Sequence, residues 1–344
     1  MGGIERALSV LANEWVKQGF SVVYVSCLKS EAFYELRPEI QVEEPTFIRA
    51  GGVVNKLFFY PKLISYIRKQ IKAHQPDVVL SFGDAFNPLA LLALRNTNIP
   101  IYISDRTSPD YHFKFPIPQL KKWLYPKATG FIAQTSRAAT YRRKEYGPTL
   151  RMKVIPNALR EVLLYPTIDR QKTILYVGRF AWEKAPDKLI RAFAKLKDAD
   201  DWILKMAGSG PMLEEMKLLA DELGVSNRVI FLGQVTNVDA LYAEAGIYVL
   251  PSVLEGFPNS LCEAMAASLP SICFPTIPYE ELFLKPGMGI VCKESNSESL
   301  AYELKILIKK NELRMQIGEN AKMISQTLNV SEIGDQYLEF MNIK

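Results

Sequence analysis

Two glutamates, Glu255 and Glu263, lie eight residues apart around a turn rich in glycine and proline. The apolar run Ile247–Leu250 predicts a strand before the turn, and a helix is expected from Ser260 onward. Carboxylates there, beside the free N–H groups of a helix start, indicate an enzyme for an anionic, polyhydroxylated ligand. The spacing does not favour a glycosidase pair, which straddles one bond at about 5–9.5 Å. Because residues 260–263 also fit a capping box for Glu263, Glu255 is the better candidate for ligand contact.

Two cations, Arg179 and Lys184, lie on a predicted loop that follows the strand Ile174–Val177. Ligands of open parallel sheets bind at such loops, beyond the carboxyl ends of the strands. Arginine offers a planar fork to phosphate oxygens and lysine a movable point charge, so the pair suits a diphosphate. The alternative is an ordinary surface loop in which Arg179 pairs with Glu183.

Glycines mark further turns where a ligand could approach the backbone closely. Gly208 and Gly210 follow one predicted strand in the run AGSGP, and Gly233 follows another. A phosphate could rest on the first turn and a base or ribose beside Gly233, although many plain turns have this composition. Gly2 and Gly3 come directly before the first helix, where a diphosphate could approach the helix N-terminus.

The first half of the chain carries two further kinds of polar segment. Asp105 and Arg106 follow a predicted strand and could bind donor or acceptor, or pair with one another. Residues 111–125 and 56–72 interleave aromatic side chains with lysines, which suits a membrane interface and anionic lipid headgroups. Core helices with solvated lysines are the simpler interpretation. Because no recognised nucleic-acid-binding module is present, no nucleic-acid partner is expected.

Alternating strands and helices must position these residues. The expected strands are Phe20–Ser26, Val78–Ser81, Ile101–Ser104, Phe131–Gln134, Ile174–Val177, Trp202–Met206, Val229–Leu232, Ile247–Leu250 and Ser271–Phe274. The expected helices are Ile4–Val16, Leu57–Lys72, Leu89–Leu94, Pro186–Leu196, Pro211–Leu223, Val238–Ala245, Ser260–Ala267 and Ser331–Met341. This alternation predicts parallel sheets covered on both faces.

The pattern of strands and helices restarts after a Pro-Asn pair at 156–157, which predicts a hinge. The expected fold class is therefore α/β, with two doubly wound, Rossmann-like domains that face each other across a cleft. The predicted domains are residues 1–157 and 158–328. The last helix, within 329–344, is expected to return to the first domain.

The composition narrows the classes of function. The 344 residues are 48% hydrophobic, and no apolar run reaches the roughly 18–20 residues that span a bilayer. No secretory signal precedes the first helix, so a cytoplasmic location is expected. The four cysteines lack C-x-x-C spacing, and two histidines cannot make a multi-histidine metal site. The charge is unevenly distributed along the chain. Residues 1–160 carry a net charge of +11 and residues 161–344 one of −6. This difference favours an anionic surface or acceptor as the partner of the first half, and ordinary solvated charge is an equal alternative.

Taken together, the motifs resemble those of the retaining family-4 glycosyltransferases, which have the GT-B fold. The resemblance covers nearly the whole chain and rests on GGIER at 2–6, GRF-x-x-EK at 178–184, AGSGP at 207–211, FLGQV at 231–235 and E-x7-E at 255–263. It implies a nucleoside-diphosphate sugar held mainly by the second domain. Arg179 and Lys184 would bind the diphosphate and stabilise the leaving group. Glu255 would contact the sugar hydroxyls, and Glu263 the ribose.

The resemblance also implies a set of donor-binding residues. These are Gly3, Gly178, Gly208, Gly210, Gly233, Gln234, Gly256, Phe257, Asn259, Ser260, Leu261 and Glu263. Asp105 or Arg106 would take the position that relatives give to acidic, basic or histidine residues beside the sugar. The implied transfer keeps the anomeric configuration and requires no metal or other cofactor.

The expected activity is transfer of a hexose from a UDP-type sugar to a glycan or lipid-linked glycan, in the assembly of surface polysaccharide or glycoconjugates. The protein is expected at the inner face of the cell membrane, with its first domain in peripheral contact with anionic lipid. The alternatives are a nucleotide-sugar epimerase and a non-catalytic module that binds sugar nucleotides.

Three positions depart from the family pattern. The family begins with a strand that leads into the two glycines, and this sequence starts at Met1 directly before them, which favours missing upstream residues. Ser268 and Ala185 stand where relatives have glycine. These two replacements are expected to be tolerated if the backbone there is not left-handed.

Overall fold

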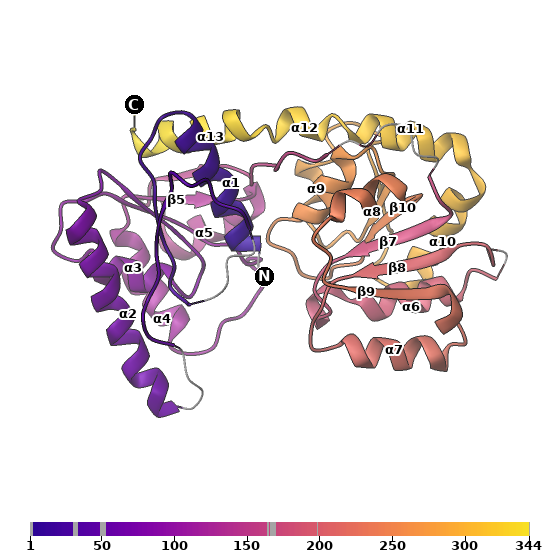
Figure 1. The fold of residues 1–344 in the computed structure, drawn as a ribbon, viewed down its shortest axis with the longest axis horizontal. Coiled ribbons are helices and arrows are strands. Elements are labelled where there is room, and N and C mark those ends of the chain that lie inside the picture. The colour runs from indigo at the N-terminus through magenta and orange to yellow at the C-terminus, as the bar shows by residue number, and fades with distance from the viewer. Residues whose placement is uncertain are drawn as a thin grey trace. The chain divides into compact units, whose positions relative to one another are not determined.

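The computed structural model describes residues 3–29, 34–48, 53–163, 165, 170–197 and 199–343. The chain divides into two compact units, drawn as ribbons in Figure 1. The first unit comprises Met1–Ala158 together with Leu328–Lys344, and the second comprises Leu159–Thr327. The predicted boundary after residue 157 lies one residue before this division.

The first unit is built on short parallel strands. Its elements are α1 (Gly3–Lys17), β1 (Val23–Val25), β2 (Gln41–Glu43), α2 (Val53–His74), β3 (Val79–Phe82), α3 (Asn87–Ala93), β4 (Ile101–Ser104), α4 (Ile117–Leu124), η1 (Tyr125–Lys127), β5 (Gly130–Ala133), α5 (Ser136–Tyr146), β6 (Met152–Val154) and α13 (Val330–Met341). Strands β3, β4, β5 and β6 form one parallel sheet in that order, and β1 pairs with β2 as a separate parallel pair. Among the described residues, no backbone hydrogen bond joins β1 to β3. The strand expected before Gly2 lies outside the described residues.

Alternating side chains place two apolar layers on the larger sheet of this unit. Ile103 and Phe131 pack in one cluster with residues of α2, α3 and α5. Tyr102 and Ile132, one position away, pack in the other with residues of α1 and α13. This period of two is that of strands buried on both faces.

Helix α13 packs against α1, so the end of the chain closes the first unit. The rings of Trp15 and Tyr337 lie 6.1 Å apart in an edge-on arrangement, and the Trp15 indole N–H donates to the Gly334 carbonyl at 3.3 Å. Helix α1 ends at Lys17, and the chain turns away at Gly19, which has a φ of +93° and donates its N–H to the Val16 carbonyl.

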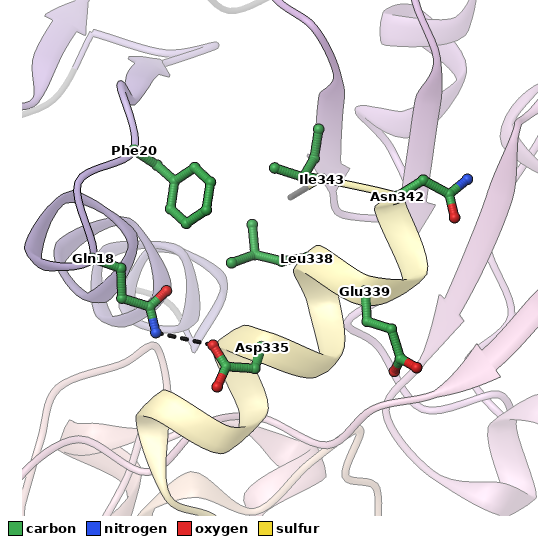
Figure 2. A pocket seen from close by; sticks show the side chains of 7 residues that line it. All are labelled: Gln18, Phe20, Asp335, Leu338, Glu339, Asn342 and Ile343. Carbon is green, nitrogen blue, oxygen red and sulfur yellow. Dashed lines mark hydrogen bonds between the residues drawn. The ribbon is translucent and has the colours of Figure 1, made fainter.

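A pocket of about 530 Å³ lies between the ends of α1 and α13 (Figure 2). Phe20, Leu338 and Ile343 form its apolar wall. At its polar side, the Gln18 amide donates to the Asp335 carboxylate at 3.0 Å (Figure 2). None of the predicted site residues lines this pocket.

The second unit holds one larger sheet. Its elements are β7 (Thr173–Val177), η2 (Trp182–Lys184), α6 (Pro186–Ala194), β8 (Ile203–Ala207), α7 (Leu213–Glu222), η3 (Ser226–Arg228), β9 (Val229–Gly233), α8 (Val238–Glu244), β10 (Ile247–Leu250), α9 (Asn259–Ala266), β11 (Ser271–Cys273), η4 (Tyr279–Glu281), β12 (Ile290–Val291), α10 (Ser297–Lys309), α11 (Asn311–Ala321) and α12 (Ile324–Thr327). The strand order is β12-β11-β10-β7-β8-β9, and all neighbours are parallel. The α/β class, with one main parallel sheet in each unit, is therefore confirmed.

Some predicted elements differ from the structure. The strand expected at Phe20–Ser26 is reduced to Val23–Val25 and is half-buried. Among the described residues it pairs with β2 alone. The sequence prediction omitted eight of the described α-helices and strands, some short or polar and others, such as α10, longer helices with an apolar face. These are β2, α4, α5, β6, β12, α10, α11 and α12. Polar β2, with sequence QVE, and α5, with sequence SRAATYRRKEY, lack the apolar period on which such predictions rely.

Candidate functional site

The sheet of the second unit brings four loops to one edge. Strands β10, β7, β8 and β9 are parallel neighbours, so the loops after Leu250, Val177, Ala207 and Gly233 lie beyond the same ends. The predicted residues found on these loops are Gly178, Arg179, Lys184, Gly208, Gly210, Gln234, Glu255, Gly256 and Phe257, and Gly233 is the last residue of β9. Three others, Asn259, Ser260 and Leu261, begin α9.

Hydrogen bonds join the loops after β7, β8 and β9 into one surface. The Phe180 N–H donates to the Ser209 carbonyl at 3.0 Å, and the Gly208 N–H to the Gly233 carbonyl at 2.7 Å. A Cβ atom on Gly208 would lie 1.9 Å from the Gly178 carbonyl oxygen, so only glycine fits there. The Gln234 amide donates to the Ser209 hydroxyl at 2.9 Å. The glycines of AGSGP are thus explained by the close approach of two loops.

The predicted phosphate cation Arg179 is largely exposed, with 63% of its side chain accessible. Its guanidinium contacts the carboxylate of Glu183, four residues along the loop. The alternative left open by the sequence, an Arg179–Glu183 ion pair, is therefore present in the structure. A pair with an exposed partner is weak and can be exchanged for another anion.

The second predicted cation, Lys184, lies beside the predicted sugar contact. Its Nζ is 2.5 Å from Oε2 of Glu255, whose side chain is 9% exposed. The carbonyl of Glu183 accepts the N–H groups of Val253 and Leu254 at 2.9 and 3.2 Å. These bonds fix the β7 loop against the β10 loop, so Lys184 and Glu255 are held together by the backbone as well as by charge.

The predicted capping box at the start of α9 is wrong. The helix begins at Asn259, its N-cap is Pro258, and no side chain caps it. The hydroxyl of Ser260 instead accepts a hydrogen bond from the Tyr248 hydroxyl at 2.8 Å. Ser260 therefore binds Tyr248, a residue of β10, instead of forming the local capping box with Glu263.

Glu263, the predicted ribose ligand, is only 2% exposed. It accepts a hydrogen bond from the Tyr242 hydroxyl at 3.2 Å and lies 3.5 Å from the Arg160 guanidinium. Arg160 also contacts the carboxylate of Asp239. Sequence reasoning missed these partners, because 103 residues separate Arg160 from Glu263 and no local motif marks the contact.

Ala185 and Ser268, the two residues that the resemblance places where relatives have glycine, lie in left-handed backbone, contrary to the condition under which the sequence predicted tolerance. Ala185 has a φ of 42° and Ser268 a φ of 56°. Ala185 is buried and precedes α6, and Ser268 follows the end of α9. Left-handed backbone costs a residue with a Cβ atom about 1–2 kcal/mol, so both positions are strained.

In the first unit, Asp105 is part of a buried charge cluster, which consists of Asp84, Asp105, Lys121 and Arg142. Lys121 Nζ is 2.7 Å from a carboxylate oxygen of each aspartate, and Arg142 is 2.7 Å from Asp105. The Tyr125 hydroxyl donates to Asp105 at 2.6 Å. Burial and the neighbouring Asp105 carboxylate raise the pKa of Asp84 to about 6. Burial acts in the same direction on Asp105, but Lys121 and Arg142 hold its pKa below the usual value.

Arg106 is not the partner of Asp105. One nitrogen of its guanidinium contacts the Asn157 side chain, and another donates to the Tyr337 hydroxyl at 2.9 Å. The guanidinium stacks on Phe82, with Cζ 3.3 Å from the ring centroid. Arg106 thus links the β4 loop to Asn157 and to α13, and its neighbour Asp105 belongs to a separate network.

Gly3, the predicted diphosphate contact of the first unit, begins α1 and is exposed, and its neighbour Gly2 lies outside the described residues. Across the described ranges, no group of three or more His, Cys, Asp or Glu side chains is arranged to hold a metal ion. None of the described helices combines the length and the apolar character needed to cross a membrane.

Two family models match the chain, each over a different part. The model described as Glycosyltransferase Family 4 matches residues 1–160, and the one described as Glycosyl transferases group 1 matches residues 165–323. A glycosyltransferase of Haemophilus influenzae, named as uncharacterized, is 29% identical over 345 residues, which cover 98% of this chain and 95% of the relative.

A second relative, from Campylobacter jejuni, is 26% identical over 349 residues, which cover 99% of this chain and 95% of the relative. Its name describes an alpha-1,4-N-acetyl-D-galactosaminyltransferase of a GalNAc-GalNAc-diNAcBac-PP-undecaprenol.

Solved structures agree over the same length. Sucrose-phosphate synthase from Thermosynechococcus elongatus has a TM-score of 0.86 at 19% identity, covering 99% of this chain and 93% of that one. HepE of Anabaena, solved in complex with UDP and glucose, has a TM-score of 0.83 at 20% identity, covering 99% and 96%. These likenesses establish the GT-B fold. With both family models matched, the chain belongs to the family-4 glycosyltransferases.

Proposed function

We propose that this glycosyltransferase moves a sugar, with retention of anomeric configuration, from a UDP sugar to a glycan or lipid-linked glycan. The observation that carries the proposal is the position of Arg179, Lys184 and Glu255 at one edge of the sheet. Backbone hydrogen bonds connect the loops that carry these two cations and the carboxylate. The name of the Campylobacter relative, which acts on an undecaprenol-linked glycan, supports the choice of acceptor. A role in surface polysaccharide or glycoconjugate assembly follows from such an acceptor.

The diphosphate would lie on the β7 loop. Arg179 and Lys184 bind its oxygens and stabilise the charge that develops when the bond from the anomeric carbon to the phosphate oxygen breaks. Helix α6, which begins at Pro186 directly after this loop, adds the positive end of its dipole. These fixed charges let the protein assist departure of the diphosphate without a metal.

The sugar and the nucleoside would lie on either side of the diphosphate. Glu255, next to Lys184, accepts hydrogen bonds from the sugar hydroxyls. Glu263, oriented by Tyr242 and Arg160, takes the ribose. Asp105 is fully engaged in the buried charge cluster, so we assign it a positioning role for the β4 loop rather than sugar contact.

An exposed surface of the first unit suits contact with an anionic membrane, at the inner face of which this enzyme would work. Phe115 and Trp123 are 80% and 51% exposed. Lys127 Nζ lies 4.0 Å from the centroid of the Trp123 ring, and Lys114 and Lys122 are also exposed. Aromatic side chains beside lysines are typical of surfaces that bind anionic lipid headgroups.

The test is an incubation of the full chain with a panel of nucleotide sugars, with and without lipid-linked glycan, in which released nucleoside diphosphate is measured. Release that depends on the acceptor is expected for one or more UDP sugars. Conversion of the donor sugar without acceptor would instead favour an epimerase. Binding of nucleotide sugar without any turnover, across acceptors, would favour a non-catalytic module.

A further inference from the structure

Glu183 has no role in the proposed transfer, although it holds one of the two phosphate cations. Its carboxylate contacts the Arg179 guanidinium, and Glu183 itself lies in the short helix η2 that follows Arg179. The glutamate side chain is 15% exposed and the arginine side chain 63% exposed. The carboxylate is therefore the confined partner, and the arginine is the one with room to move.

The main chain fixes Glu183 in place. Its carbonyl accepts two N–H groups from the β10 loop, those of Val253 and Leu254. Because these bonds involve no side-chain atom, they persist whichever anion pairs with the Arg179 guanidinium. A ligand that reaches Arg179 therefore finds the main chain of Glu183 in the same position, from which the carboxylate can pair with the arginine again once the ligand leaves.

The charges of this edge cancel without a ligand. Arg179 pairs with Glu183 and Lys184 pairs with Glu255, so two cations face two carboxylates. A diphosphate that arrives here must exchange with a carboxylate at each cation that it takes. Exchange at Arg179 costs less, because exposed ion pairs are weak and Arg179 can turn toward solvent.

We infer that Glu183 is an internal substitute for phosphate that sets the affinity of the donor site. When the site is empty, the Glu183 carboxylate pairs with Arg179. The diphosphate of the donor replaces the carboxylate at Arg179, and the carboxylate pairs with Arg179 again when the nucleoside diphosphate leaves. The inference rests on the proposed function, since it requires the diphosphate to bind at Arg179. It makes Glu183 a determinant of affinity and of product release that the motif alone does not reveal.

The experiment measures UDP binding by calorimetry for the full-length wild type and Glu183→Gln. Glutamine keeps the size of the side chain and removes its charge. We expect the variant to bind UDP about two- to tenfold more tightly. The Glu183 carboxylate no longer competes with the phosphate for Arg179, and it no longer repels the phosphate. Its affinity should also fall more steeply with added NaCl, because the site now carries one net positive charge.

The matched control is Glu214→Gln, which removes the same charge from an exposed pair with Lys217 on α7. It should leave UDP affinity and its salt dependence as in the wild type. A second variant, Glu183→Ala, should shift affinity in the same direction as Glu183→Gln. A purely structural role of Glu183 would weaken binding and would not steepen the salt dependence.

The outcomes separate the two proposals. If the wild type binds UDP and the Glu183 variants bind it equally or more weakly, the inference is overturned and the proposed function stands. An equal gain for Glu214→Gln also overturns it, since the effect would then be one of net charge alone. If neither the wild type nor any variant binds UDP, the proposed donor site fails, and the inference fails with it.

Discussion

Both units carry opposite charges at the carboxyl ends of their strands, but the two sets differ in burial. Side chains of the buried charge cluster in the first unit are 2–6% exposed. At the edge of the second unit, Arg179 is 63% and Lys184 21% exposed. A buried charge must keep its partners, because removal of one leaves the other uncompensated. An exposed cation can change partners when an anion arrives.

This difference assigns different tasks to similar residues. The buried charge cluster fixes the loop after β4, where the Arg106 and Thr107 N–H groups also donate to Asp84 at 3.2 Å. The second edge holds its cations in pairs that a ligand can open. Mutations should therefore affect the free energy of unfolding in the first unit and sugar transfer in the second.

The largest expected effect is that of Lys121→Met, which removes the ammonium group between Asp84 and Asp105. Two buried carboxylates then share Arg142, so the free energy of unfolding should fall by about 3–5 kcal/mol. Denaturant titration measures this loss. Lys122→Met, at the exposed next position, is the control and should stay within about 0.5 kcal/mol of the wild type. A loss below about 1 kcal/mol at Lys121 would remove the distinction between the two regions.

The next effect concerns catalysis at the second edge. Arg179→Ala and Lys184→Ala should each cost about 2.7–4 kcal/mol of transition-state stabilisation, the range for a lost oxyanion donor. Because Arg179 is exposed, its replacement by alanine should lower the free energy of unfolding by less than about 1 kcal/mol. Steady-state transfer rates and denaturant titration measure the two quantities, with Lys217→Ala as the control. Rates within tenfold of the wild type for both variants would refute the assignment of the diphosphate site.

A smaller effect is expected of Glu255→Gln. The loss of a charged hydrogen-bond acceptor for the sugar should slow transfer by about 1.5–3 kcal/mol in activation free energy. Binding of UDP should be largely retained, because the phosphates contact Lys184 and Arg179, and Lys184 loses only a competing carboxylate. Transfer assays and UDP calorimetry on the same preparation compare the two. Parallel loss of transfer and UDP binding would place Glu255 outside the sugar contact.

Much of the fold could be predicted from the sequence, because strands buried on both faces are continuous apolar runs. The strands Ile101–Ser104 and Ile247–Leu250 have the predicted bounds. Half-exposed β1 was predicted too long, since the apolar character of residues 20–26 says nothing of where its pairing ends. Parallel order then places the loops of the second unit at one edge.

The partners of the site residues could not be predicted, because they come from distant parts of the chain. Lys121 looked like a solvated lysine in a basic, aromatic segment, yet it is 3% exposed and joins two aspartates. Glu263 fitted a local capping pattern, but Tyr242 and Arg160 bind it instead. Sequence patterns thus located the charges, and only the packing decides which of them a ligand can reach.

Backbone strain offers the smallest and most local comparison of the two units. In the first unit, left-handed non-glycine positions include Asn96, and asparagine tolerates this conformation. In the second, Ser268 has a φ of 56° and ends α9 as a Schellman turn, with its N–H donated to Met265 and that of Leu269 to Ala264.

Ser268→Gly should therefore raise the free energy of unfolding by about 0.5–1 kcal/mol, as relief of strain exceeds the added flexibility of the unfolded chain. Denaturant titration against Ala267→Gly provides the control, because Ala267 has a φ of −77° and its replacement should destabilise by a similar amount. Opposite signs at adjacent positions would show that the conformation of the turn, rather than glycine itself, decides the outcome. A destabilised Ser268→Gly would mean that the serine side chain contributes more at the end of α9 than its left-handed backbone costs.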